Sequence, residues 1–259
     1  MADTVAPAIH KPIWIDLASS DPAASREFYG RLFGWQVEVN PDPQYGGYTV
    51  AKIGGKDVAG IGGKMSPEAP TTWSVYIWTP DAEDLAKKVQ GAGGKVVVPP
   101  MQVGEQGKMA VFADPSGASI SAWQPAMMAG GLTDGQPGSL GWAELNSRGI
   151  EKAAAFYAAV FGWTSKNSPM GDGRPPYNEF WSGDQFIAGG MDMSPMVPAD
   201  VPSYWMVYFA ADDVDGSYRK ALDAGARELV APEDFPGGRF AILTDPQGAM
   251  FGLMKMTRR

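Results

Sequence analysis

Hydrophobic and polar residues alternate in short runs along this chain, and the runs predict strands. Residues 13–18 place aliphatic side chains on one face and mixed side chains on the other, which is typical of a half-buried strand. A helix is predicted next, because Asp21 can cap it, Pro22 suits its first turn and Gly34 is placed to end it.

The rest of the first half follows the same kind of pattern. Further strands are predicted at residues 48–53, 57–61, 74–78, 95–98, 108–112 and 118–123, and a second helix at 82–90. Gly54-Gly55-Lys56 suits a hairpin turn, and Gly91 is expected to close the second helix. The Asp-Pro-Ser-Gly sequence at 114–117 suits a type I turn before the last strand.

The second half of the chain repeats the first. The residues Trp14, Asp16, Leu17, Phe28, Tyr29, Phe33, Gly34 and Trp35 return 128 positions later as Trp142, Glu144, Leu145, Phe156, Tyr157, Phe161, Gly162 and Trp163. A repeat this long indicates two domains. We expect an α+β protein with four βαβββ modules in two pairs: a first domain at 8–125, a Gly-rich linker at 126–139 and a second domain at 140–257.

Composition narrows the function classes. The chain has 259 residues and no Cys, which fits a reducing compartment, and no apolar run approaches the roughly 20 residues of a membrane span. The first ten residues do not resemble a signal sequence, so we expect a cytoplasmic protein without a membrane partner. A net charge of −8 with scattered Lys and Arg argues against nucleic acid and suits a neutral or cationic ligand.

These motifs together resemble the vicinal-oxygen-chelate superfamily, which includes glyoxalase I, extradiol dioxygenases and bleomycin resistance proteins. The resemblance lies in the Trp14 strand, the Phe28-Tyr29 to Trp35 segment, the glycines at 91–94 and the turn at 114–117, and it recurs in the second half. It implies paired modules, each pair curving its sheet around a cavity. Single-domain relatives form dimers, so we expect a monomer that is a pseudo-dimer, or a homodimer.

The superfamily usually holds a divalent metal ion with His and Glu side chains, and this chain departs from that pattern. The resemblance places the ligand positions at Trp14, Gly60, Ser74 and Ser121, and at Trp142, Gly189, Met206 and Gly252. None of these residues is an imidazole or a carboxylate. With one His and no Cys, the usual zinc, nickel or iron site cannot be assembled, so we predict no metal and no cofactor.

Other groups are predicted on the cavity face instead. Residues two apart in a strand share a face, so Asp16 lies beside Trp14, and Glu144 lies beside Trp142. A buried carboxylate can serve as a general acid or base or bind a cation, although it can equally well be tied into sheet packing. By the same alternation Tyr76 and Tyr208 face inward as candidates to polarise a ligand oxygen.

The remaining candidate ligand contacts are mostly aromatic. They are Trp14, Trp142, Ser74, Trp78, Met206, Asn146, Tyr48, Tyr177, Ser121 and Trp123. Aromatic faces with polar tips suit a flat, partly polar ligand, although such stripes are more often core. His10 is expected to be exposed or to serve as a cap, and Lys108 and Arg239 are matched cations that end strands or contact an anionic group.

Two function classes fit these residues. The first is a metal-independent enzyme on a hydrophobic, aromatic metabolite, with Asp16 or Glu144 as proton acceptor and isomerase, lyase or hydroxylase-type chemistry. The second is a protein that sequesters a flat, cationic drug or metabolite without catalysis. An interaction or secreted-antigen role with vestigial cavities is a third reading.

Overall fold

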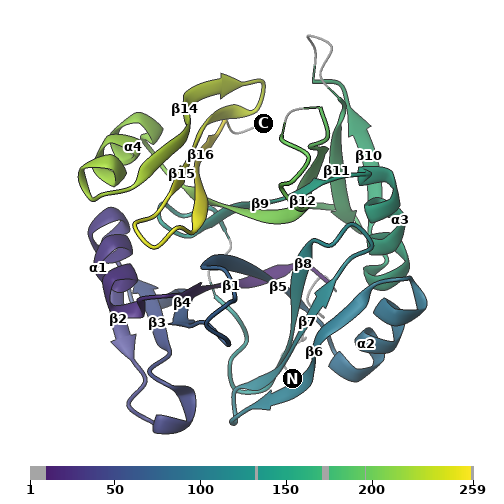
Figure 1. The fold of residues 1–259 in the computed structure, drawn as a ribbon, viewed down its shortest axis with the longest axis horizontal. Helices are drawn as coiled ribbons and strands as arrows, with labels where there is room; N and C mark the ends of the chain where they lie inside the picture. Colours follow the sequence, from purple (N-terminus) through teal and green to yellow (C-terminus); the bar gives the residue numbers. More distant parts are fainter. Residues whose placement is uncertain (1–9, 132–133, 171–174, 196, 258–259) are drawn as a thin grey trace, which may run out of the picture. The chain divides into compact units, whose positions relative to one another are not determined.

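The computed structural model describes residues 10–131, 134–170, 175–195 and 197–257 (Figure 1). The first half contains β1 (Pro12–Ser19), α1 (Pro22–Phe33), β2 (Gln36–Val39), the short 3-10 helix η1 (Pro43–Tyr45), β3 (Thr49–Ile53), β4 (Lys56–Gly63), β5 (Thr72–Trp78), α2 (Ala82–Gly91), β6 (Lys95–Val103), β7 (Gly107–Ala113) and β8 (Ser119–Pro125). The second half contains β9 (Leu140–Ser147), α3 (Ile150–Phe161), β10 (Thr164–Ser168), β11 (Tyr177–Ser182), β12 (Gln185–Asp192), β13 (Tyr204–Ala210), α4 (Val214–Asp223), β14 (Arg227–Phe235), β15 (Gly238–Thr244) and β16 (Met250–Met256).

Each half forms one eight-stranded sheet, and the two sheets have the same strand order. The first is β2-β3-β4-β1-β5-β8-β7-β6 and the second is β10-β11-β12-β9-β13-β16-β15-β14. Within a module the first strand runs parallel to the last, as β1 does to β4 and β5 does to β8. The α+β class and the tandem βαβββ modules are therefore confirmed.

The structure divides into two compact units that do not coincide with the two halves of the sequence. Unit 1 is made of 76–129 and 144–205 with the described part of 1–13, and unit 2 of 14–75, 130–143 and 206–259. Each unit thus holds one module from each half. The domain limits 8–125 and 140–257 follow the repeat and stay a prediction, and residues 132–133 of the expected linker lie outside the described residues.

A polar latch in unit 2 joins a helix of the first half to a turn of the second. The Tyr29 hydroxyl on α1 donates to Asp245 Oδ2 at 3.0 Å and accepts from Trp73 Nε1 at 2.9 Å. Asp245 Oδ1 meanwhile accepts the backbone N–H groups of Gln247 and Ala249, which fixes the turn before β16. All three side chains of the latch are buried.

Unit 1 contains the same latch with the halves exchanged. Tyr157 on α3 donates to Asp114 Oδ2 at 3.0 Å and accepts from Trp205 Nε1 at 2.8 Å. The Asp-Pro turn and the Phe-Tyr pair that define the repeat are thus one structural device. The presence of these residues in both halves therefore has a structural explanation.

Several element boundaries differ from those predicted. The strands β2 and β10 were missed, because their side chains are almost all exposed and give no apolar alternation. Gly91 is the last residue of α2 rather than the residue that closes it, and Ala92 caps the helix. The cap Asp21 and the left-handed Gly34 (φ 72°) are as predicted, as is the Gly54-Gly55 turn with positive φ at both residues.

Candidate functional site

A phenol lies between an indole and a carboxylate on the sheet face that is turned away from α1. Ile15 and Leu17 are buried on the helix side of β1, so Trp14 and Asp16 project to the other side. Trp14 Nε1 donates to the Tyr48 hydroxyl at 3.0 Å, and that hydroxyl lies 3.4 Å from Asp16 Oδ2. Tyr48 comes directly before β3 and is half-buried.

The Tyr48 ring occupies the space above Gly60. A Cβ at Gly60 would overlap the Tyr48 hydroxyl and would also crowd the Cβ of Asp16. Gly60 pairs with Asp16 in the parallel register of β1 and β4, so glycine is what allows the phenol to reach the carboxylate. The sequence analysis placed a metal-ligand position of the superfamily here, and that placement stays a prediction.

The second half repeats the arrangement with closer contacts. The Tyr177 hydroxyl donates to Glu144 Oε2 at 2.8 Å, and Asn146 Nδ2 lies 3.4 Å from Glu144 Oε1. Glu144 and Asn146 are buried, and Gly189 leaves the space that the Tyr177 ring fills. Tyr48 and Tyr177, expected only as ligand contacts, are therefore the phenols that meet Asp16 and Glu144.

Burial favours the protonated form of the Tyr48 phenol. The pKa of Tyr48 is raised well above its ordinary value, chiefly by burial and then by the negative charge of Asp16, although the Trp14 hydrogen bond opposes the shift. Tyr204, near the same carboxylate as Tyr177, also has a raised pKa because of burial and of Glu144. The chemistry available here is that of a neutral phenol that donates to a carboxylate.

The other predicted inward-facing phenols lie on β5 and β13 and are buried. Tyr76 is opposite Ser121, and Tyr208 is opposite Gly252, whose missing side chain makes room for the Tyr208 ring. Tyr76 is in unit 1 and Asp16 in unit 2, while Tyr208 is in unit 2 and Glu144 in unit 1. The predicted role of Tyr76 or Tyr208 in polarising a ligand oxygen stays a prediction.

The other candidate contacts are spread over the two units. Met206 is buried on β13, Ser74 is half-buried on β5, and Trp142 is half-buried on β9. Trp78 is opposite Trp123, whose indole Nε1 donates to the Met128 carbonyl at 2.8 Å. The sequence analysis missed Glu179 and Trp181, which share the face of Tyr177, although their i, i+2, i+4 spacing on β11 could have found them.

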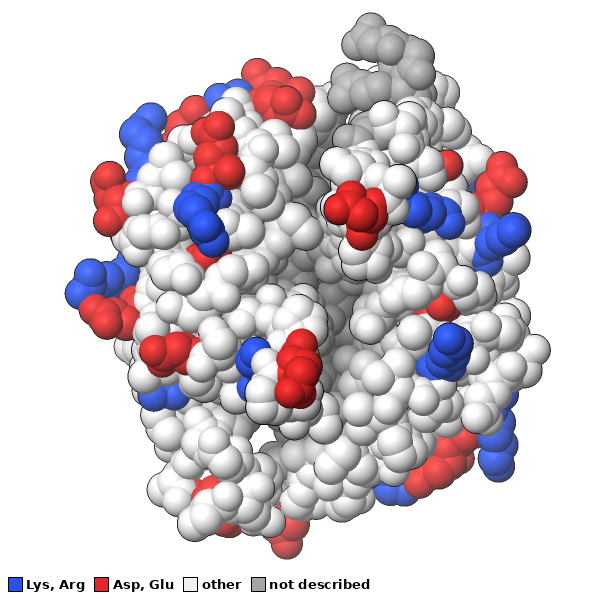
Figure 2. Space-filling view, viewed as in Figure 1, with Lys and Arg blue, Asp and Glu red and all other residues white. Residues whose placement is uncertain are grey.

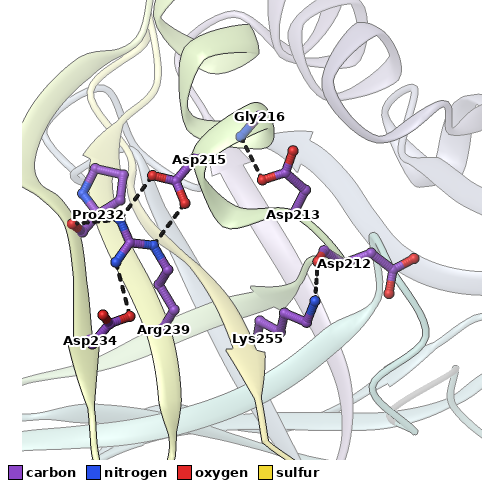
Figure 3. Close-up of polar contacts among 8 residues, drawn as sticks. All are labelled: Asp212, Asp213, Asp215, Gly216, Pro232, Asp234, Arg239 and Lys255. Carbon is purple, nitrogen blue, oxygen red and sulfur yellow. Dashed lines mark hydrogen bonds and ion pairs between the residues drawn. The ribbon is translucent and has the colours of Figure 1, made fainter.

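The matched cations Lys108 and Arg239 are paired with acids of neighbouring helices. Arg239 forms a bidentate contact with Asp215 at 2.7 and 2.8 Å and also contacts Asp234 at 2.9 Å (Figure 3). Its guanidinium lowers the pKa of Asp215. Lys108 contacts Glu83 at 2.7 Å in the corresponding place. Both cations therefore attach a strand to the first turn of a helix.

His10 and the surface charges bear on the remaining expectations. His10 is half-buried rather than exposed, and its Nδ1 donates to the Trp78 carbonyl at 3.0 Å, while burial lowers its pKa.

On the face shown in Figure 2, acidic and basic side chains are interspersed. Among the described residues no helix is long and apolar enough to cross a membrane.

Comparison with known proteins decides the family. Residues 11–121 match the model of the glyoxalase/bleomycin resistance protein/dioxygenase superfamily, and residues 142–254 match that of a glyoxalase-like domain. The chain belongs to this superfamily. The resemblance to the vicinal-oxygen-chelate proteins is thereby confirmed, and so is the tandem arrangement.

Two curated relatives from this superfamily match almost the whole chain. A putative glyoxylase, CFP32, of Mycobacterium tuberculosis is 39% identical over 250 residues, which cover 94% of each protein. The anthracycline biosynthesis protein DnrV of Streptomyces peucetius is 39% identical over 260 residues, which cover 95% of this chain and 93% of the relative.

Solved structures of the superfamily share the fold at low identity. A Mn(II)-bound glyoxalase from Novosphingobium aromaticivorans has a TM-score of 0.66 at 16% identity, with 95% of this chain and 82% of that chain covered. The 2,3-dioxygenase LapB from Pseudomonas sp. KL28 has a TM-score of 0.64 at 14% identity, with 96% and 93% covered.

The metal ion that many members of the superfamily hold does not fit the residues of this chain. In the part of the chain that the structure describes, no three His, Cys, Asp or Glu side chains are grouped so that they could hold a metal. Tyr48, Tyr177 and Tyr208 moreover fill the space beside Gly60, Gly189 and Gly252. At these three glycines the structure thus offers neither a donor atom nor room for a ligand side chain.

Proposed function

We propose that this chain binds a flat aromatic small molecule without holding a divalent metal ion. The observation that carries the proposal is a phenol that contacts a carboxylate beside Gly60 and again beside Gly189, two positions where the family resemblance would place metal ligands. At Gly60 and again at Gly189 a tyrosine ring fills the space of a ligand side chain and hydrogen-bonds to a carboxylate. A group that both halves keep at the position used for chemistry in the superfamily is a candidate for the same task.

The relatives support an aromatic ligand. DnrV carries the name of an anthracycline biosynthesis protein, and anthracyclines are fused-ring aromatic compounds with hydroxyl and carbonyl oxygens. Rings of that kind suit contact with half-buried indoles such as Trp142 and hydrogen bonding to a phenol. The name DnrV belongs to the relative. That this chain binds an aromatic ligand is our proposal.

A proton relay is the reaction step that the geometry permits. A ligand hydroxyl or N–H donates its proton to the Tyr177 oxygen as the phenol passes its own proton to Glu144. The ligand keeps the electron pair of the broken bond and becomes an anion, while the carboxylate becomes a carboxylic acid. Tyr177 is neutral before and after the step. The same relay can run through Tyr48 and Asp16.

Sequestration without reaction is the second candidate. The raised pKa of Tyr48 favours it, because a phenol that stays protonated serves a bound ligand as a hydrogen-bonding partner without any proton transfer. The two candidates differ in what happens to the ligand. A compound recovered with a changed mass after long incubation supports conversion, and an unchanged compound supports sequestration.

Binding is tested with 1,4-dihydroxyanthraquinone by quenching of tryptophan fluorescence. We expect saturable quenching, and Tyr48→Phe and Tyr177→Phe should each weaken binding at their own site by about tenfold, the effect of one lost hydrogen bond to a buried partner. Tyr45→Phe, which removes a hydroxyl on η1, is the matched control. Unchanged affinity in both variants, or about one Zn, Fe or Mn ion per half by elemental analysis, would contradict the proposal.

A further inference from the structure

One cross-strand pair differs in kind between the two halves. Trp181 and Phe186 stand opposite each other on β11 and β12, and their rings stack at 5.2 Å between centroids with 20° between planes. The repeat places Lys52 and Asp57 at the same positions on β3 and β4, where the two charged groups lie 3.9 Å apart. The fold is thus built equally well without aromatic rings at this pair.

The aromatic pair lies on the same sheet face as the candidate site of the second half. Phe180 packs against Tyr157 of α3, so Glu179 and Trp181 face away from the helix, as Tyr177 does. A hydrogen bond from Trp181 Nε1 to Glu179 Oε2 at 3.2 Å confirms the shared face. All of these residues belong to unit 1.

The ammonium group of Lys166 already lies over the face of the Trp181 ring. Lys166 Nζ lies 4.1 Å from the ring centroid, within the range of a cation–π interaction. The Lys166 side chain is exposed, so its ammonium can leave for water at little cost, whereas Trp181 is half-buried and fixed by Glu179.

Glu179 supports this ring as a cation site. It is 9% exposed and receives a second hydrogen bond, 2.6 Å long, from Ser168 Oγ to its Oε1. A carboxylate at the indole N–H increases the negative charge on the ring and adds its own attraction for a cation nearby. The residue at this position in the first half is Val50, which supplies no charge.

We propose that Trp181, Phe186 and Glu179 form a subsite for an alkylammonium group of the ligand, and that Lys166 occupies this subsite until the ligand displaces it. The inference deepens the proposed function, since it names the ligand class as an aromatic molecule that carries a protonated amine. Glu179 fixes Trp181 and adds its own negative charge, and Glu179 and Trp181 lie two and four residues along β11 from Tyr177. The second half is then the one that selects the ligand.

The test uses 2-phenylethylammonium and its neutral counterpart 2-phenylethanol. Binding is followed by the NMR signal of the Trp181 indole N–H, which is assigned by its loss in Trp181→Phe. We expect the ammonium probe to shift this signal with an affinity about tenfold higher than that of the alcohol, as a desolvated cation–π contact supplies. Equal affinities, or no shift of this signal with the ammonium probe, would overturn the inference.

Two variants separate a cation subsite from a merely structural contact. Lys166→Met keeps the apolar stem but removes the internal competitor, so it should raise affinity for the ammonium probe by about threefold or more. Lys52→Met, at the ionic pair of the first half, should leave that affinity unchanged. A loss of affinity in Lys166→Met would show that Lys166 builds the contact rather than blocks it, and would overturn the inference.

Glu179→Gln should reduce the preference for the ammonium probe over the alcohol to less than about threefold, because the carboxylate charge is removed while the hydrogen-bond acceptor is kept. A preference that survives in this variant would count against the role of Glu179. Since none of these readouts uses the anthraquinone, failure of the proposed function and failure of this inference are separate results.

Discussion

Gly60 and Gly189 decide the chemistry of the site more than any polar residue does. Each leaves a volume beside the strand that a tyrosine ring fills. The phenol reaches the carboxylate only because the strand carries no Cβ at that point. The phenol–carboxylate pair therefore depends on glycine at these two positions.

Gly60→Ala tests this dependence. The new methyl group overlaps the Tyr48 hydroxyl, so we expect a loss of about 1–3 kcal/mol in the free energy of unfolding, the usual cost of overpacking. Gly63→Ala on the same strand is the control, because no atom lies within 4 Å of the position of its new Cβ.

A double-mutant cycle, measured by urea unfolding, tests whether Tyr48 is the residue that the new methyl group overlaps. Gly60→Ala should cost clearly less in a Tyr48→Ala background, where the overlapping ring is gone. An equal cost in both backgrounds would mean that the penalty comes from the backbone of β4 and not from the phenol.

Buried tyrosines also predict how stability depends on pH. The pKa values of Tyr29, Tyr48 and Tyr157 are raised well above 10.0, in each case first by burial and then by a nearby Asp. A raised folded-state pKa means that the neutral phenol is favoured by folding. This stabilisation is complete below the unfolded pKa of about 10 and is lost as pH rises toward the folded values.

We therefore expect these three phenols to ionise only as the protein unfolds in base. The absorbance of tyrosinate and the circular dichroism should change together for this group, while exposed tyrosines titrate earlier. Tyr29→Phe should remove one ionisation from the late step. Ionisation of all tyrosines near pH 10 with the fold intact would show that burial does not hold them neutral.

At the scale of the elements, α1 and α3 are each attached to a turn of the other half by one buried tyrosine hydroxyl. Tyr29→Phe leaves Asp245 Oδ2 without its donor and Trp73 Nε1 without its acceptor, so the free energy of unfolding should fall by about 1–3 kcal/mol. Tyr157→Phe breaks the matching bonds to Asp114 and Trp205 and should cost a similar amount.

Thermal unfolding with Tyr45→Phe as the control checks this prediction, since Tyr45 lies on the short η1 helix and not in a latch. A shift in the control as large as that in either latch variant would show that the loss reflects tyrosine hydroxyls in general.

The sequence predicted strands that carry buried apolar side chains and missed strands whose two faces are exposed. β1 and β5 are mostly buried and were found, whereas every residue of β2 is exposed, so its pairing with β3 alone makes it a strand. Glycines with positive φ, such as Gly34 and Gly54, were predictable because their conformation is local.

The candidate site was predictable only in part. Strand alternation placed Asp16 beside Trp14 and Glu144 near Asn146, because those relations are local. The partnership of Asp16 with Tyr48 depends on the register between β1, β4 and β3, which the sequence does not state. Tyr76 and Tyr208 were predicted to polarise a ligand oxygen, because alternation along their own strands turns them inward.

At the scale of the whole molecule, duplication has made the two halves depend on each other. Unit 1 and unit 2 each combine a module of the first half with a module of the second, and the latches Tyr29–Asp245 and Tyr157–Asp114 both join different halves. Neither half of the sequence contains a complete latch of the kind found in the intact chain.

Cutting the chain in the Gly-rich segment tests this dependence. Residues 1–129 expressed alone hold Tyr29 without Asp245, and residues 130–259 hold Tyr157 without Asp114. We expect each fragment alone to lack the cooperative unfolding transition of the full chain, because each module lacks the module of the other half that completes its compact unit. Mixing equal amounts should restore a one-to-one complex with a native-like circular dichroism spectrum.

A fragment could also pair with a second copy of itself, since Tyr29 and Asp114 occupy matching places in the repeat. Size-exclusion chromatography with light scattering distinguishes these results, and Tyr29→Phe should weaken either complex because each uses this phenol. If instead each fragment is a monomer that unfolds cooperatively at the temperature of the intact protein, the halves are independent domains, and the exchange of modules between units is not what stabilises the chain.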